Sequence, residues 1–235
     1  MSDVDDTTGQ GRRILTAVER LVDDADNLIA QVEGFKLDLA PRIEHGDAEH
    51  QRDVAQRLVA SYSTRSAIAG GVTAMPGLLP GGGTVVAVVG GSLVDMTFML
   101  KHEVEMVLCL THLYGHDIRD ERERWLAYVL AAVHTYEVKS GRNYFVDLAE
   151  VQIEALAKYT PRQLSKLAIA AVGKVAVLSA TRGIVKGLPL IGIAVSASAN
   201  KMLTRSVGWR CMDALACRAA EEHAHGGVVV DAVVT

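Results

Sequence analysis

Residues 66–94 read SAIAGGVTAMPGLLPGGGTVVAVVGGSLV, and the prediction of the fold starts from this stretch. It holds no charged residue across 29 positions, eight of which are glycine. A membrane span rarely carries two prolines and three consecutive glycines at its centre. We therefore predict a hairpin of two close-packing apolar segments that turn between Pro76 and Gly83. Two placements remain open: the hairpin lies inside a helical bundle, or it inserts into or lies on a bilayer.

The composition limits the class of protein. The chain has 235 residues, of which 49% are hydrophobic and only 5% aromatic, so we expect a core of Ala, Val, Leu and Ile. A net charge of −4 argues against nucleic acid as a partner, because phosphate contacts need clustered Lys and Arg. Three cysteines without a CxxC pair indicate a reducing compartment. The acidic start MSDVDDTTGQ differs from a secretory signal, so we expect the protein on the cytoplasmic side.

Periodicity divides the chain into four parts. Residues 1–11 are predicted to be a disordered leader, 12–62 to form N-terminal amphipathic helices, 63–224 to form a helical domain, and 225–235 to be an apolar tail. In the first amphipathic helix, apolar residues recur at positions 14, 18, 21, 25, 28 and 32, and Gly34 is its predicted stop. This stripe either packs on the bundle or forms a coiled coil with a second copy.

Local signals mark further helices. A long helix follows residue 95 and is expected to end at Gly115, and the next is expected to begin at Asp117. Residues 160–163, TPRQ, combine an N-cap, a proline at the first helical position and a glutamine at the third. No alternation long enough for a sheet occurs. We predict an all-α bundle of six or seven helices with the Gly/Pro-rich apolar hairpin at its centre.

Three stretches carry a family resemblance. The first is GGVTAMPGLLPGGG at 70–83, followed by Asp95; the second is an apolar helix that closes on LYGHD at 113–117; the third is the block KGLPLIGIAVSASANKMLTRSVGWRCMDALACR at 186–218. Together they resemble the EcsC family of bacterial proteins, over about residues 62–218. The resemblance implies a helical, hydrophobic, membrane-associated protein. It implies no enzyme, because that family has no settled biochemical activity.

One polar pattern remains on the helix after residue 95. Six side chains fall within an arc of about 100°: Asp95, His102, Glu105, Cys109, His112 and His116. Histidine, carboxylate and thiolate all bind zinc or iron. An antiparallel helix hinged near residue 116 brings His134 level with residue 98. One hypothesis is therefore a zinc or iron site formed by Asp95, His102, Glu105 and His134. A solvent-facing stripe or a buried polar seam fits the same pattern.

Three functions from different classes follow. The first is a non-enzymatic protein that acts at the cytoplasmic membrane face or on a membrane-bound partner such as a transporter. The second is a soluble helical metalloprotein or enzyme that uses the His/Glu stripe. The third is a scaffold that forms homo-oligomers through the N-terminal helix and the tail. No GxxxxGK[ST] or GxSxG motif is present, and mean hydropathy is +0.19, so the sequence favours the first.

Overall fold

The computed structural model describes residues 2–40, 47–73, 93–141, 158–182 and 189–228. Within these ranges the chain forms seven helices and no strand, which confirms the all-α prediction. The helices are α1 (Ser2–Leu21), α2 (Ala25–Leu39), α3 (Asp47–Thr73), α5 (Val94–Leu113), α6 (Glu121–Ser140), α8 (Pro161–Arg182) and α9 (Pro189–Val228). The turn of the predicted hairpin and most of the predicted tail lie outside the described residues.

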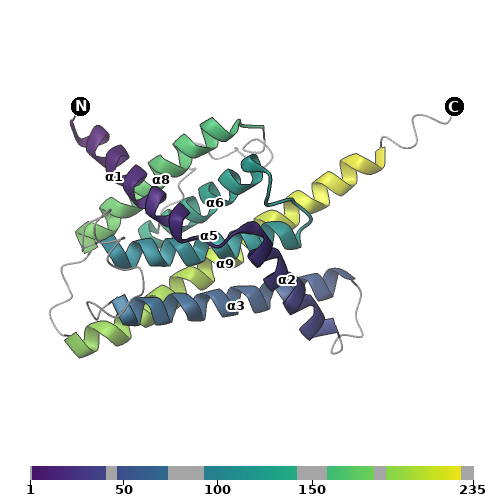
Figure 1. Cartoon of the computed structure of the whole chain (residues 1–235), viewed down its shortest axis with the longest axis horizontal. Coiled ribbons are helices and arrows are strands. Elements are labelled where there is room, and N and C mark those ends of the chain that lie inside the picture. Colours follow the sequence, from purple (N-terminus) through teal and green to yellow (C-terminus); the bar gives the residue numbers. More distant parts are fainter. Residues whose placement is uncertain (1, 41–46, 74–92, 142–157, 183–188, 229–235) are drawn as a thin grey trace.

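Helix α5 is the centre of the bundle. Every residue from Val104 to Thr111 is buried, so this helix is covered on all sides. It contacts α1, α2, α3, α6 and α9. Figure 1 shows α6 and α8 on one side of α5 and α3 on the other, with α9 crossing the length of the bundle. The main core consists mostly of aliphatic side chains, as the low aromatic content predicts.

Helix α1 shows that the predicted disordered leader at 1–11 is wrong. Its N-terminal half packs closely on α8, where both helices lack a side chain. A Cβ atom on Gly11 would lie 2.3 Å from the carbonyl oxygen of Ile169, and one on Gly173 would lie 2.5 Å from that of Thr7. The polar composition of the segment suggested disorder because no apolar stripe is present. The contact instead joins two backbones, which composition does not reveal.

The apolar stripe at positions 14–32 spans two helices, so the single predicted helix is also wrong. Asp24 lies at the break and caps α2, because its side chain accepts a hydrogen bond of 2.9 Å from the backbone N–H of Asn27. Gly34 ends no helix and lies within α2. The stripe is nevertheless buried against the main core, at Ile14, Val18, Leu28 and Val32. It therefore packs within the bundle, as one of the two alternatives predicts.

Two local signals are confirmed. Gly115 follows the end of α5 with a left-handed φ of 96°. At the start of α8, the Thr160 hydroxyl accepts from the backbone N–H of Gln163 at 3.4 Å, and the Gln163 side chain accepts from the backbone N–H of Thr160 at 2.9 Å. This reciprocal pair is a capping box.

The predicted start of the next helix at Asp117 is wrong by four residues. Asp120 is the N-cap of α6, and its side chain accepts from the backbone N–H of Arg122 at 2.7 Å. The longer connection shifts the register of α6 against α5. The hydroxyl of Thr135 contacts the carboxyl of Glu103, so residue 134 lies level with about residue 104 rather than with residue 98.

The helix ends that flank the two Gly/Pro-rich stretches lie at one end of the bundle. The C-terminal ends of α3 and α8 and the N-terminal ends of α5 and α9 all lie toward the same end of the long axis (Figure 1). Ala69 and Val94, near the two ends of the uncharged stretch, share a small apolar cluster with Phe98. Helix α3 is continuous across the predicted boundary between residues 62 and 63. No helix in the described ranges has the length and apolar content needed to span a membrane.

Candidate functional site

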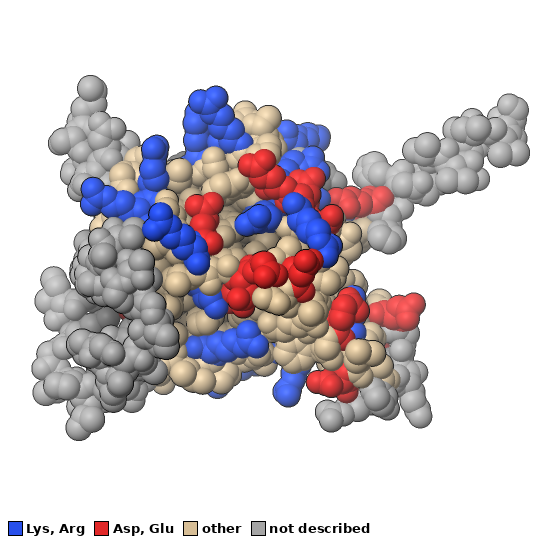
Figure 2. Space-filling model, viewed as in Figure 1, with Lys and Arg blue, Asp and Glu red and all other residues tan. Residues whose placement is uncertain are grey.

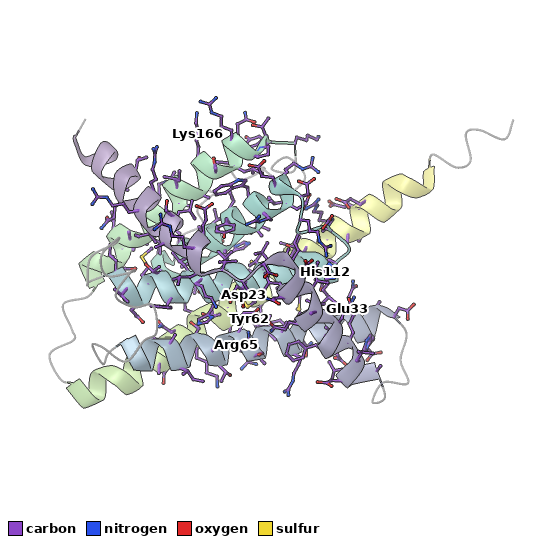
Figure 3. The ribbon with its side chains drawn as sticks, viewed as in Figure 1. Asp23, Glu33, Tyr62, Arg65, His112 and Lys166 are labelled. Carbon is purple, nitrogen blue, oxygen red and sulfur yellow. The ribbon has the colours of Figure 1, made fainter. Side chains whose placement is uncertain are left out.

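The solvent-facing alternative for the polar stripe is wrong, because none of its six side chains is exposed: Glu105 and Cys109 are buried and the other four are half-buried. The Glu105 side chain is 1% exposed and that of His102 is 14% exposed, while Cys109 is 0% exposed. Helix α2 packs against the C-terminal end of this stripe, where the carboxylate of Glu33 lies 3.6 Å from the imidazole of His112 (Figure 3). The thiol of Cys109 lies 3.5 Å from the hydroxyl of Tyr62 on α3, and burial raises the pKa of this thiol to about 12.

The four residues predicted to bind metal do not converge on one point. Asp95 accepts a hydrogen bond of 3.2 Å from the Asn200 amide on α9. His102 and Glu105 are the pair that the structure brings together, with 3.7 Å between Nδ1 and Oε2. His134 instead lies 3.0 Å from Glu137 on its own helix. Among the described residues, no group of three or more His, Cys, Asp or Glu side chains is arranged to hold a metal ion.

Glu105 holds the junction between α1 and α2 in place. Its Oε1 accepts a hydrogen bond of 3.0 Å from the backbone N–H of Asp23, in the break between the two helices (Figure 3 labels Asp23). The ammonium of Lys101 lies 2.8 Å from its other oxygen. Burial alone would raise the pKa of Glu105, but the contacts with His102, Lys101 and the Asp23 N–H outweigh burial and lower it. The carboxylate therefore stays ionised and acts as a structural anchor.

Glu103 differs from the other buried glutamates because it has no ion pair within the described residues. Its Oε1 lies 3.3 Å from the Thr204 hydroxyl of α9, and Thr204 in turn donates to Ser66 of α3 at 2.9 Å. Its Oε2 contacts the Thr135 hydroxyl of α6. One carboxyl group thus joins four helices at a fully buried point. Burial raises the pKa of Glu103 to about 7 despite the Thr135 contact and the positive charge of Lys139.

The hydroxyl contacts explain how a neutral Glu103 is accommodated. Thr135 has one hydroxyl proton and lies 2.7 Å from the carbonyl oxygen of Ala131 as well as in contact with Glu103. A protonated Glu103 donates to Thr135, which frees the Thr135 proton for Ala131. All three groups are then satisfied without a buried charge. This arrangement can hold or release one proton in the middle of the bundle.

The remaining two buried glutamates are paired with arginines. Glu123 and Arg218 form a bidentate ion pair, with N–O distances of 2.8 and 2.9 Å between α6 and α9. Glu137 is 3.1 Å from Arg210. Charge on both sides of the α6–α9 contact thus fixes how these helices lie against each other. Sequence reasoning missed Glu103 and Glu123.

Comparison with known proteins adds no relative. No family model matches the chain, and no curated protein or solved structure matches it either. The resemblance to the EcsC family therefore stays a prediction, and the geometry carries the functional argument.

The surface at the α3–α9 end combines apolar and basic side chains. Ile68 on α3 is 62% exposed and Met202 on α9 is 71% exposed. Lys201 and Arg205 are exposed beside Met202 on α9, and neither has a hydrogen bond or ion pair with a described residue. The hydrogen bond between Ser66 and Thr204 shows that these parts of α3 and α9 lie side by side. We call Ile68, Lys201, Met202 and Arg205 the basic-apolar surface.

The acidic side chains visible in Figure 2 have a different distribution. On the face drawn, Asp and Glu gather mostly over the half of the molecule away from the helix ends that flank the Gly/Pro-rich stretches. A net acidic chain thus has exposed cations on α9 beside the start of its uncharged stretch. A surface of this kind suits contact with a negatively charged, partly apolar layer.

Proposed function

We propose that this protein is a non-enzymatic helical protein that attaches to the cytoplasmic face of a membrane. Attachment takes place through the end of the bundle that carries the basic-apolar surface. The observation that carries the proposal is the pairing of exposed Ile68 and Met202 with Lys201 and Arg205. These side chains lie near the C-terminal end of α3, where the uncharged stretch of the sequence begins at Ser66.

The described side chains alone support reversible attachment. Burying two large aliphatic side chains in the interface contributes at most about 3–6 kcal/mol. Each basic side chain near an anionic surface contributes about 1 kcal/mol. The total of about 5–8 kcal/mol, before the cost of immobilisation, corresponds to weak binding with a dissociation constant near or above the micromolar range. Attachment would therefore respond to lipid charge and to salt.

A membrane-bound protein is the partner class that follows from the EcsC resemblance. Such a partner, a transporter for example, would be met at the same membrane face. The opposite end of the bundle, where the acidic side chains gather in Figure 2, would then point into the cytoplasm. The buried glutamates on α5 and α6 serve to hold the bundle together in this proposal, rather than to catalyse a reaction.

A vesicle flotation experiment tests the proposal. The full chain is mixed with vesicles of phosphatidylcholine alone or with added phosphatidylglycerol, and the floated fraction is measured at low and high salt. We expect flotation with the anionic vesicles, and we expect the double variant Ile68→Glu, Met202→Glu to lose it. Leu37→Glu is the matched control, since Leu37 is 73% exposed on α2 and lies outside the basic-apolar surface. Equal flotation of both variants, or none for the native chain, would refute the proposal.

A further inference from the structure

A groove opens between α3 and α9, near the N-terminal end of α3 and the C-terminal half of α9. The two antiparallel helices approach most closely at Gly208, where a Cβ atom would lie 2.7 Å from Val59 Cγ1. From this crossing they diverge toward the N-terminal end of α3 and the C-terminal half of α9 (Figure 1). The groove between them has a volume of about 690 Å³, and Tyr114 contributes to its lining.

Four of the ten described residues that line the groove are alanines. Ala48 on α3 and Ala216 and Ala220 on α9 line it. Ala216 and Ala220 are four residues apart and so lie on one face of α9. Small side chains let a further helix approach at the short end of the usual interaxial range of about 8–10 Å. The groove is thus shaped for a helix.

Two opposite charges, Arg52 and Asp213, lie in the groove near the hydroxyl of Tyr114, whose pKa both of them affect. Arg52 on α3 and Asp213 on α9 line opposite walls, and neither has an ion pair or hydrogen bond with a described residue. Tyr114 is only 9% exposed, and its hydroxyl also lacks a hydrogen bond within the described part of the chain. Burial, together with the charge of Asp213, raises the pKa of this hydroxyl. The groove therefore offers a cation, an anion and a hydroxyl to an incoming surface.

We propose that a second copy of this chain fills the groove, with α9 of each copy lying between α3 and α9 of the other. A two-fold axis would pass between the two α9 helices near Ala216 and Ala220. Arg52 then faces Asp213 of the partner subunit, and the symmetry repeats the same pair on the other side. The two charges that are unpaired in one chain complement each other in two.

The length of α9 and its projecting C-terminal end also favour a second copy as the occupant of the groove. Helix α9 has 40 residues, whereas its neighbour α3 has 27. Its C-terminal end projects beyond the bundle in Figure 1. A helix is marginally stable in water without packing on one face, so a partner along this segment supplies contact that the single chain lacks. The apolar stripe at positions 14–32, one of the predicted surfaces for self-association, is buried within its own chain.

Charge reversal with complementation tests the interface. Sedimentation velocity is measured over a range of concentrations, without vesicles, for the native chain, Arg52→Asp and Asp213→Arg. We expect a native dimer and a rise of the dissociation constant by at least about tenfold in each variant, because each places like charges together twice. An equimolar mixture of the two variants should associate again, since both pairs then carry opposite charges. Lys166→Asp, an exposed change on α8 (Figure 3), is the control and should behave as the native chain.

Loss of association must be distinguished from loss of folding. Circular dichroism and melting temperature establish that each variant is folded, and the mixture guards against a loss of association caused by misfolding. A native chain that stays monomeric at every concentration would overturn the proposal. A dimer that neither variant weakens would also overturn it, because the contact would then lie elsewhere. A mixture of the two variants that remains monomeric would do the same. Flotation on vesicles is independent of these results, so this inference and the proposed function can fail separately.

Discussion

Substitution at the crossing of α1 and α8 should show whether the N-terminal segment is part of the folded bundle. Gly11→Ala would place a Cβ atom 2.3 Å from the carbonyl oxygen of Ile169, and Gly173→Ala would place one 2.5 Å from that of Thr7. Both contacts involve backbone atoms, which cannot rotate away as a side chain can. Helix α1 must move by about 1 Å to restore an ordinary carbon–oxygen separation, and the contacts along its length loosen with it.

The expected magnitude is a balance of two effects. Overpacking of a tight contact costs about 1–3 kcal/mol. Replacing glycine by alanine within a helix contributes about 1 kcal/mol in the opposite direction. The free energy of unfolding should therefore fall by up to about 2 kcal/mol in each variant. For a chain of this length the melting temperature should drop by up to about 8 °C.

Thermal and urea unfolding of single and double variants provide the measurement. Gly34→Ala is the matched control: it lies within helix α2, nothing lies within 4 Å of its added Cβ, and it should raise stability. The double variant Gly11→Ala, Gly173→Ala should cost less than the sum of the singles, because one displacement of α1 relieves both contacts. If Gly11→Ala and Gly173→Ala both stabilise the chain as Gly34→Ala does, α1 does not dock on α8 and the reasoning is wrong.

Two further predictions concern the buried glutamates. The pKa of Glu103 is raised in the fold from the ordinary 4.5 to about 7, so its contribution is complete below pH 4.5 and is lost as the pH rises to 7. The stability of the native chain relative to Glu103→Gln should therefore fall by about 3 kcal/mol across this window, as measured by urea unfolding; a constant difference would contradict a neutral Glu103. Arg218→Met leaves the carboxylate of Glu123 buried without its bidentate partner, and should cost about 3–5 kcal/mol. Adding Glu123→Met should recover most of that loss, and a double variant as unstable as the single would show that packing of Arg218, rather than its charge, matters.

Local features of this protein were predictable because they depend on neighbours in the chain. The capping box at Thr160 and Gln163 needs only residues three apart. The end of α5 before Gly115 needs only a residue that tolerates a positive φ. The all-α class follows in the same way from apolar spacing. The predictions were wrong at the α1–α2 break and at the start of α6. There Asp24 and Asp120 act as N-caps, and this local role overrides the longer-range apolar pattern.

Which polar groups are buried was decided by tertiary structure alone. Glu103 and Glu105 are two residues apart, so their side chains project in different directions from α5. Sequence spacing can therefore assign at most one of them to a solvent-facing side of the helix. The fold surrounds both. Glu105 contacts the Lys101 ammonium of its own helix and a backbone N–H of the α1–α2 junction. Glu103 contacts hydroxyls of α6 and α9. The protonation state of a carboxyl depends on the solvent and charges around it. Much of those surroundings comes from helices far apart in the chain. The sequence therefore determined that these glutamates lie on a helix, and packing determined that the pKa of Glu105 is lowered while that of Glu103 is raised to about 7.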